Sequence, residues 1–186
     1  MSLETLMSAW GLPAVFAGAI VEGEGVAFLG GALAHRGMFS YEAAALAATG
    51  GAFVVDQAMF HIGRHSARFA FAKRMLARPV AKDLLARLGK RPLLSCLGMR
   101  FIFGMKTLGA LALGASGIAP ATYLALDLIS AAVWAHVVTA LGFGAGQTIE
   151  TMFGRLPLHS HFAIAVVVVV LAMGSAELAR RCHSRR

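Results

Sequence analysis

Two cations within an apolar stretch are the residues of this sequence best suited to chemistry. Arg100 and Lys106 lie in GMRFIFGMKTLGALALGASG, residues 98–117, which is about long enough to cross a bilayer and is rich in glycine. A cation near the bilayer centre costs about 2.5–3.5 kcal/mol, so each needs a counter-charge, water or a bound anion. Glycines let the backbone break where protein shields it. We predict a re-entrant hairpin that carries positive charge; a spanning helix whose cations snorkel to one surface is the alternative.

Two acids that could balance these cations lie near the N-terminus. Glu22 and Glu24 stand in VEGEG, which interrupts the first apolar block, residues 11–37. Two carboxylates in a glycine-flanked break predict a second hairpin. One tilted helix over residues 10–37 with buried, neutral glutamates is the alternative.

The composition places these charges in a membrane protein. Of 186 residues, 58% are hydrophobic and 14% charged, and the mean hydropathy is +0.72, which is too apolar for a soluble domain of this length. The net charge of +8 is concentrated in polar segments that flank apolar ones. This pattern favours anionic membrane lipids as partners over nucleic acid. Cys96 and Cys182 match no metal or redox spacing, so we expect no metal and no cofactor.

Three further apolar blocks are predicted to span the bilayer. Residues 41–62 form the first and carry Asp56 in its last third. Residues 120–143 form the second and carry Asp127, and the third lies within residues 158–178.

A basic segment separates the first spanning block from the cationic hairpin. Residues 64–91 hold nine Lys or Arg residues and a single acid, Asp83. Their apolar side chains recur at helical spacing, at Ala77, Val80, Ala81, Leu84, Leu85 and Leu88. One apolar face on a basic helix predicts a helix that lies on the membrane surface.

The distribution of Lys and Arg also predicts the topology. The basic segment 64–91 and the basic tail, residues 179–186, should both be cytoplasmic, and an even number of crossings separates them. The N-terminus is then outside. Residues 11–63 and 92–143 each read as hairpin, turn and spanning helix, so residues 1–186 form one domain built on an inverted repeat. The fold class is therefore an all-α integral membrane protein with two opposed re-entrant hairpins and about three spanning helices.

Several motifs together resemble the DedA family of bacterial membrane proteins, which is related to eukaryotic lipid scramblases. In this sequence they read EGE at residues 22–24, GALAHRG at 31–37, GAFVVDQAMFHIGR at 51–64 and RFIFGMKTLGALALG at 100–114, continuing to Tyr123 and Trp134. The sequence also departs from the family pattern. Lys106 replaces the usual Arg, Asp127 the usual Asn, Val55 a Gly and Ala110 a Pro, and Leu12 stands where an acid is often found.

The resemblance implies lipid translocation in the bacterial inner membrane: transfer of undecaprenyl phosphate or another phospholipid between leaflets, coupled to the proton gradient. Arg100, Lys106 and Arg64 are the candidates for binding the phosphate. The candidates for proton coupling are Glu22, Glu24, Asp56 and Asp127. Lys106 keeps the charge but lacks the bidentate fork of arginine.

Two other functions stay open. A proton-coupled carrier of small ions would use the same charges. A lipid phosphatase would need a nucleophile beside an acid–base partner, and the serines and histidines show no such grouping, so we predict that the protein is not an enzyme. The sequence leaves open a homo-oligomer and the identity of the lipid.

Overall fold

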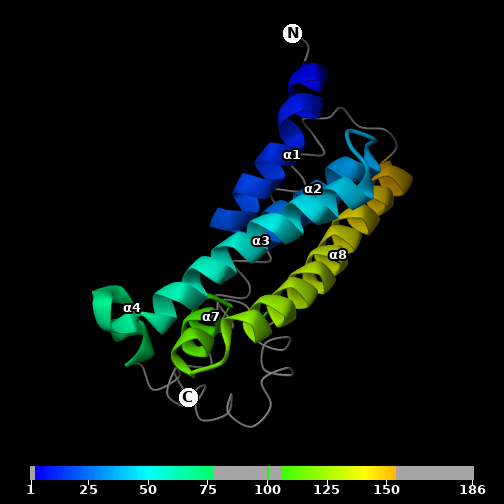
Figure 1. The fold of residues 1–186 in the computed structure, drawn as a ribbon. Helices are drawn as coiled ribbons and strands as arrows, with labels where there is room; N and C mark the ends of the chain where they lie inside the picture. Colours follow the sequence, from blue (N-terminus) through cyan, green and yellow to red (C-terminus); the bar gives the residue numbers. More distant parts are fainter. Residues whose placement is uncertain (1–2, 78–99, 101–105, 154–186) are drawn as a thin grey trace, which may run out of the picture.

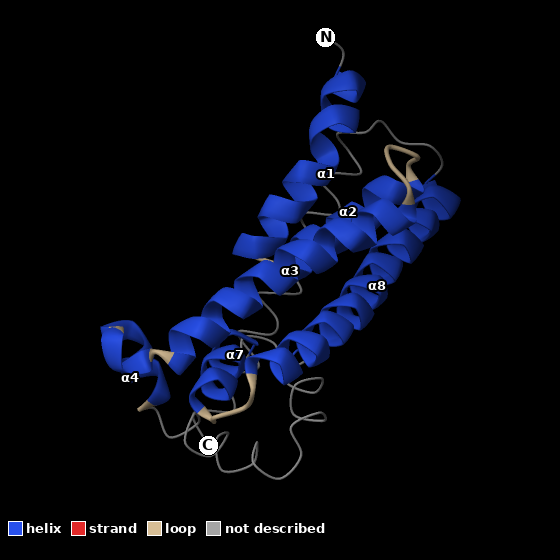
Figure 2. Cartoon of the chain, viewed as in Figure 1, coloured by secondary structure: helices blue, strands red, loops and turns tan. Residues whose placement is uncertain are grey.

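The described part of the chain is entirely helical. The computed structural model describes residues 3–77, Arg100 and residues 106–153, and within these ranges it contains helices and turns but no strand (Figure 2). Among the described residues, two helices are long and apolar enough to cross a membrane: α3 (Tyr41–Arg64) and α8 (Pro120–Phe153), the latter over Pro120–Met152. They lie side by side and form the long axis of the molecule (Figure 1).

The N-terminal apolar block is broken as VEGEG predicts. α1 (Leu3–Val21) ends there and α2 (Glu24–His35) begins. Gly23 joins them with φ of 84°, a conformation that favours glycine. The two helices turn back on each other, because Gly30 packs against Val15, and a Cβ at Gly18 would lie 2.8 Å from a methyl of Val26. The single tilted helix is therefore ruled out, whereas re-entry into the membrane stays a prediction.

The helices α3 and α8 run antiparallel. The Tyr41 hydroxyl, at the start of α3, donates to the carbonyl of His136 in the middle of α8. At the other end of α3, Arg64 donates to the carbonyl of Ile118, just before α8 begins. Opposite directions are what the predicted topology requires of these two segments. The absolute orientation in the membrane stays a prediction.

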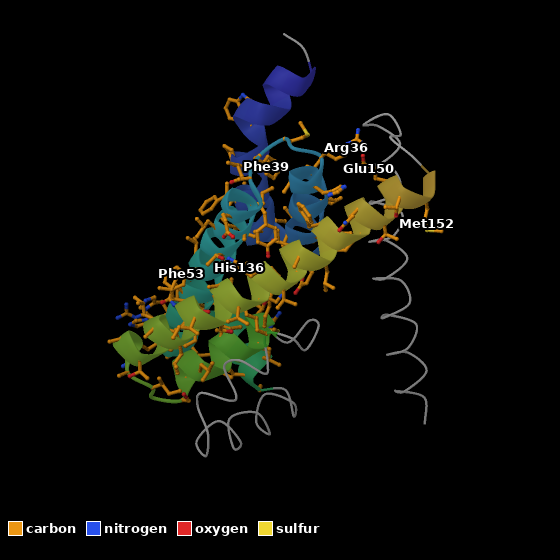
Figure 3. All side chains as sticks on the ribbon, turned by 90° about the vertical axis from the view of Figure 1, so that its right-hand side faces the viewer. Arg36, Phe39, Phe53, His136, Glu150 and Met152 are labelled. Carbon is orange, nitrogen blue, oxygen red and sulfur yellow. The ribbon has the colours of Figure 1, made fainter. Side chains whose placement is uncertain are left out.

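Helix α8 extends well beyond the predicted boundary. It runs from Pro120 to Phe153, ten residues past the expected end at residue 143. The extension carries Glu150, whose carboxylate lies 2.8 Å from Nε2 of His35 at the end of α2. Arg36 and Glu150 are both found at this end of the molecule (Figure 3). This tertiary contact therefore stabilises the end of α8, where the sequence turns polar and does not predict a helix.

Glycines bring pairs of helices into backbone contact. A Cβ at Gly31 of α2 would overlap the carbonyl of Thr139 in α8, and one at Gly142 of α8 would overlap the carbonyl of Phe28. These two contacts form the α2–α8 crossing. A larger residue at either glycine would push the two helices apart.

A second crossing repeats this arrangement between α3 and α7 (Lys106–Ala115). Here Gly114 of α7 lies against the carbonyl of Phe60, and Gly63 of α3 lies against the carbonyl of Leu111. Each spanning helix is thus crossed by the short helix that precedes the other one in sequence.

Several sequence predictions fall wholly or partly on residues outside the described ranges. Within the basic segment 64–91 the structure describes η1 (Ser66–Arg68) and α4 (Ala70–Leu76), while the amphipathic stripe beyond Ala77 lies outside. The first half of the cationic hairpin, apart from Arg100, also lies outside, as do the third spanning block and the tail.

Candidate functional site

A buried arginine holds two carboxylates at the centre of the site. The Nη1 atom of Arg100 lies 2.7 Å from Oδ2 of Asp56 on α3 and 2.9 Å from Oδ1 of Asp127 on α8. All three residues are buried. Two carboxylates that share one cation carry a net negative charge between them, so a further cation nearby is favoured. The cluster joins the two spanning helices where they pass each other.

Neighbouring side chains fix the two aspartates. Gln57, which follows Asp56 on α3, donates from Nε2 to Oδ2 of Asp127 at 2.8 Å. The hydroxyl of Tyr123 lies 3.5 Å from the carbonyl oxygen of Asp56. The Tyr123 ring stacks on Phe60 with centroids 4.1 Å apart. Gln57 on α3 therefore holds the carboxylate of Asp127, while Tyr123 on α8 contacts the backbone of Asp56.

Lys106 supplies the second cation at the first residue of α7. Its Nζ lies 3.6 Å from Oε2 of Glu24, the first residue of α2, and 3.4 Å from the carbonyl oxygen of Glu22. A Cβ at Gly23 would overlap that Nζ. The break between α1 and α2 therefore meets the start of α7, and the positive φ of Gly23 favours glycine at this point.

An indole ring faces both cations. The Cζ atom of Arg100 lies 5.4 Å from the ring centroid of Trp134, and Nζ of Lys106 lies 5.6 Å from it. Trp134 is on α8, two helical turns after Asp127 and on the same face. One face of α8 thus presents a carboxylate and an aromatic ring to the two cations.

A small cavity adjoins the cluster. The volume open to the centre of a water molecule is about 20 Å³, which is room for roughly one water molecule. Its lining combines the charged groups with small residues of α7, and consists of Asp56, Arg100, Lys106, Gly109, Ala110, Leu113, Tyr123 and Asp127. A lipid phosphate does not fit this space, so binding one would require the helices to separate.

The seven site residues predicted from the sequence differ in their position relative to this cavity. Four of them line the cavity: Asp56, Arg100, Lys106 and Asp127. Glu24 joins them through Lys106. The remaining two, Glu22 and Arg64, are placed differently from the expectation.

Glu22 contacts Lys106 through its backbone carbonyl, while its carboxylate lies beside Gly25 in the first turn of α2. An acid at the N-terminal end of a helix is stabilised by the helix dipole, which explains this placement. Arg64 is exposed and bonds the carbonyl of Ile118 in the turn before α8, so it closes that turn and takes no part in the charged cluster.

Two further residues of the site carried no role in the sequence prediction. Gln57 orients Asp127, and its position next to Asp56 was the available signal. Trp134 faces both cations, and its spacing of two turns from Asp127 could have indicated that it shares the same face. Within the described ranges, no three His, Cys, Asp or Glu side chains lie close enough together to hold a metal ion.

Comparison with known proteins identifies the family of the chain. Residues 10–144 match the VTT domain. The inner membrane protein YohD of Escherichia coli (strain K12) is 33% identical over 175 residues, which cover 94% of this chain and 91% of that protein. No solved structure matches the chain. The matched region contains every residue of the charged site, and the chain is therefore a membrane protein of the VTT domain family, also called the DedA/SNARE-associated family.

Proposed function

We propose that this protein moves a phosphate-bearing lipid between the leaflets of the bacterial inner membrane without changing it chemically. Undecaprenyl phosphate is the first candidate, as the DedA resemblance implies, and another phospholipid is the second. Membership of a family generally regarded as membrane transport proteins supports transport over catalysis. The similar E. coli protein is named an inner membrane protein, which supports the same location here.

The observation that carries the proposal is a pair of neighbouring cations, of which Arg100 is buried and Lys106 is partly buried. Arg100 is 6% exposed, yet its charge is shared by two carboxylates through a single nitrogen, Nη1. A lipid phosphate that passes through the bilayer interior needs such a cation, because an unpaired anion is costly there. Lys106 adds a second positive charge next to it, and the apolar faces of α3 and α8 leave the lipid tails in the bilayer.

Proton coupling follows from competition for the same cations. Glu24 pairs with Lys106, and Asp56 and Asp127 pair with Arg100. A carboxylate that takes up a proton releases its cation to the phosphate, and one that loses its proton displaces the phosphate again. Protons and lipid would then use the site in turn.

An inverted repeat is part of this proposal. The matching glycine contacts of the α2–α8 and α3–α7 crossings support two structurally equivalent halves. In transporters built from inverted repeats the substrate site lies where the two halves meet. Here Lys106 of the second half contacts Glu24 of the first.

The test is lipid transfer in proteoliposomes that contain fluorescent lipids with different headgroups. Lipids with a phosphate monoester should cross faster than a neutral lipid with the same tails. Lys106→Gln should slow the transfer about tenfold through loss of one charge–phosphate contact, whereas Lys106→Arg should keep or raise the rate, because arginine grips phosphate with two donors. Transfer that ignores headgroup charge would refute the phosphate site, and release of inorganic phosphate would refute transport without chemistry.

Glu24→Gln provides the matched test of coupling. The amide keeps the shape of the side chain but cannot exchange a proton, so this variant should bind lipid and lose its response to an imposed pH gradient. A response of normal size would remove Glu24 from the coupling mechanism.

A proton-coupled carrier of small ions is the second candidate function. The size of the cavity favours it, since about 20 Å³ accommodates a water molecule and no headgroup. Ion flux through protein that moves no labelled lipid would select this function.

A further inference from the structure

Trp134 is positioned to act on both cations at once. The charge centres of Arg100 and Lys106 lie 5.4 and 5.6 Å from its ring centroid. Attraction between a cation and an aromatic ring is appreciable within about 6 Å, and it is strongest for tryptophan and in desolvated surroundings. Trp134 is 3% exposed. The contact with Arg100 therefore belongs to the buried, stronger kind, while the contact with Lys106, whose side chain is 21% exposed, is partly open to solvent.

The ring is held in place by helices that carry neither cation. Trp134 packs in one cluster with Val15 of α1, Ala27 of α2, and Ala48 and Ala52 of α3. Arginine and lysine side chains, in contrast, rotate about several bonds and need a partner to fix their position. A fixed ring beside two adaptable cations determines where the cations rest.

An aromatic ring attracts cations without cancelling their charge. Arg100 uses Nη1 for both aspartates, while its Nε and Nη2 are buried and have no hydrogen-bond partner among the described residues. The side chain of Arg100 is 5% exposed, so these donors are not satisfied by bulk water. Such a pair of N–H donors is the edge with which arginine grips a phosphate bidentately.

We propose that Trp134 positions Arg100 and Lys106 as a single anion-binding surface, whose contact edge is the Nε/Nη2 side of Arg100. Without the ring, Arg100 is free to turn both edges toward the two aspartates, and Lys106 is free to move closer to Glu24. This inference rests on the proposed function. It identifies Trp134 as the residue that sets the affinity of the site for the lipid phosphate.

Graded fluorination of the ring tests the proposal. The chain has two tryptophans, and Trp10 is 66% exposed, so a Trp10→Phe protein carries only Trp134. Fluorinated tryptophans incorporated into it weaken the ring's attraction for cations stepwise while hardly changing its size. The Kd for dioctanoyl phosphatidic acid should rise with each fluorine, reaching about tenfold for the most fluorinated ring. A Kd that stays constant over the series would reduce Trp134 to a packing residue and overturn the inference.

Fluorescence of Trp134 in the same background gives a second readout that needs no lipid. Lys106→Met removes the charge but keeps an unbranched side chain, and it should shift the emission of Trp134. Lys73→Met, on the exposed part of α4, is the matched control and should leave the emission unchanged. If both variants and the parent have the same emission spectrum, Lys106 does not face the ring of Trp134, contrary to the proposal.

The outcomes separate this inference from the proposed function. Tight binding of phosphatidic acid that depends on fluorination, without transfer between leaflets, would refute lipid translocation and leave the role of Trp134 intact. Transfer with a Kd independent of fluorination would refute the role of Trp134 alone. Absence of any binding would refute both, and dioctanoylglycerol, which has no phosphate, is the neutral control.

Discussion

Arg100 is the residue on which the other charges of the site depend. It is the cation shared by Asp56 and Asp127, which come from different spanning helices. Removing one member of a buried ion pair costs more than removing the whole pair, because an uncompensated charge stays behind. The role of Arg100 in folding and its role in binding can therefore be separated by mutation.

Arg100→Gln should lower the free energy of unfolding by about 3–5 kcal/mol, because it leaves two buried carboxylates facing each other. Adding Asp56→Asn and Asp127→Asn should restore most of that stability, while lipid transfer stays lost. Thermal unfolding in detergent and transfer in proteoliposomes measure the two effects. Arg68→Gln, at an exposed position of η1, is the control. Recovery of transfer in the triple variant would show that the site works without Arg100.

At the level of single residues, the sequence indicates which charged side chains lie in apolar segments, but it does not indicate which groups they contact. Arg100, Lys106, Asp56 and Asp127 were predicted because each is expensive in an apolar segment, and the structure brings them together around one cavity. Glu22 and Arg64, which lie outside this cavity, are next to helix ends, where backbone groups compete for charged side chains. Sequence spacing does not reveal that competition.

The helices meet through glycine at two crossings, and these contacts decide which elements can carry the site. At the α2–α8 and α3–α7 crossings the backbones touch, so helix separation is set by the absence of a Cβ. Two glycines of α8 differ sharply in this respect. A Cβ at Gly142 would overlap the backbone of Phe28, while one at Gly144 would meet nothing within 4 Å.

Gly142→Ala should therefore destabilise the protein by about 1–3 kcal/mol through forced separation of α2 and α8. Gly144→Ala should be neutral or stabilising by up to about 1 kcal/mol, because alanine favours the helix. Unfolding midpoints of the two variants in the same detergent provide the comparison. Equal midpoints would contradict the close crossing.

Element boundaries were predictable where local signals mark them. α3 begins at Tyr41, directly after Ser40, whose hydroxyl accepts from the amide of Ala43 as an N-cap. The break at Gly23 and the turn at Gly37 were also visible as glycines, and both have positive φ. The extension of α8 to Phe153 was not predictable, because contacts such as His35–Glu150 join residues far apart in sequence.

For the whole molecule, the predicted topology puts the C-terminal end of α3 and the C-terminal end of α8 on opposite sides of the membrane. Met152 lies near the end of α8 and is 72% exposed, and Ala67 is exposed in η1, just after α3 ends. The antiparallel arrangement places the C-terminal ends of α3 and α8 at opposite ends of the molecule (Figure 1).

Single cysteines at these positions, in a background with Cys96→Ser and Cys182→Ser, test the orientation. An impermeant maleimide added outside should label Met152→Cys, while Ala67→Cys should react only after the inner membrane is opened. The reverse pattern would invert the predicted topology. Labelling of both from the same side would contradict the spanning pair itself.

The length of α8 has a consequence for how the bilayer acts on the protein. Its 34 residues extend over about 51 Å, whereas the hydrocarbon layer is about 30 Å thick. Even tilted by 40°, the helix would cover about 39 Å of depth, so it projects beyond the acyl chains. Asp127 and Trp134 lie on the same rigid rod as the projecting end. Packing against α2 and α3 sets the tilt of this helix, so the same contacts set the depth at which the charges lie.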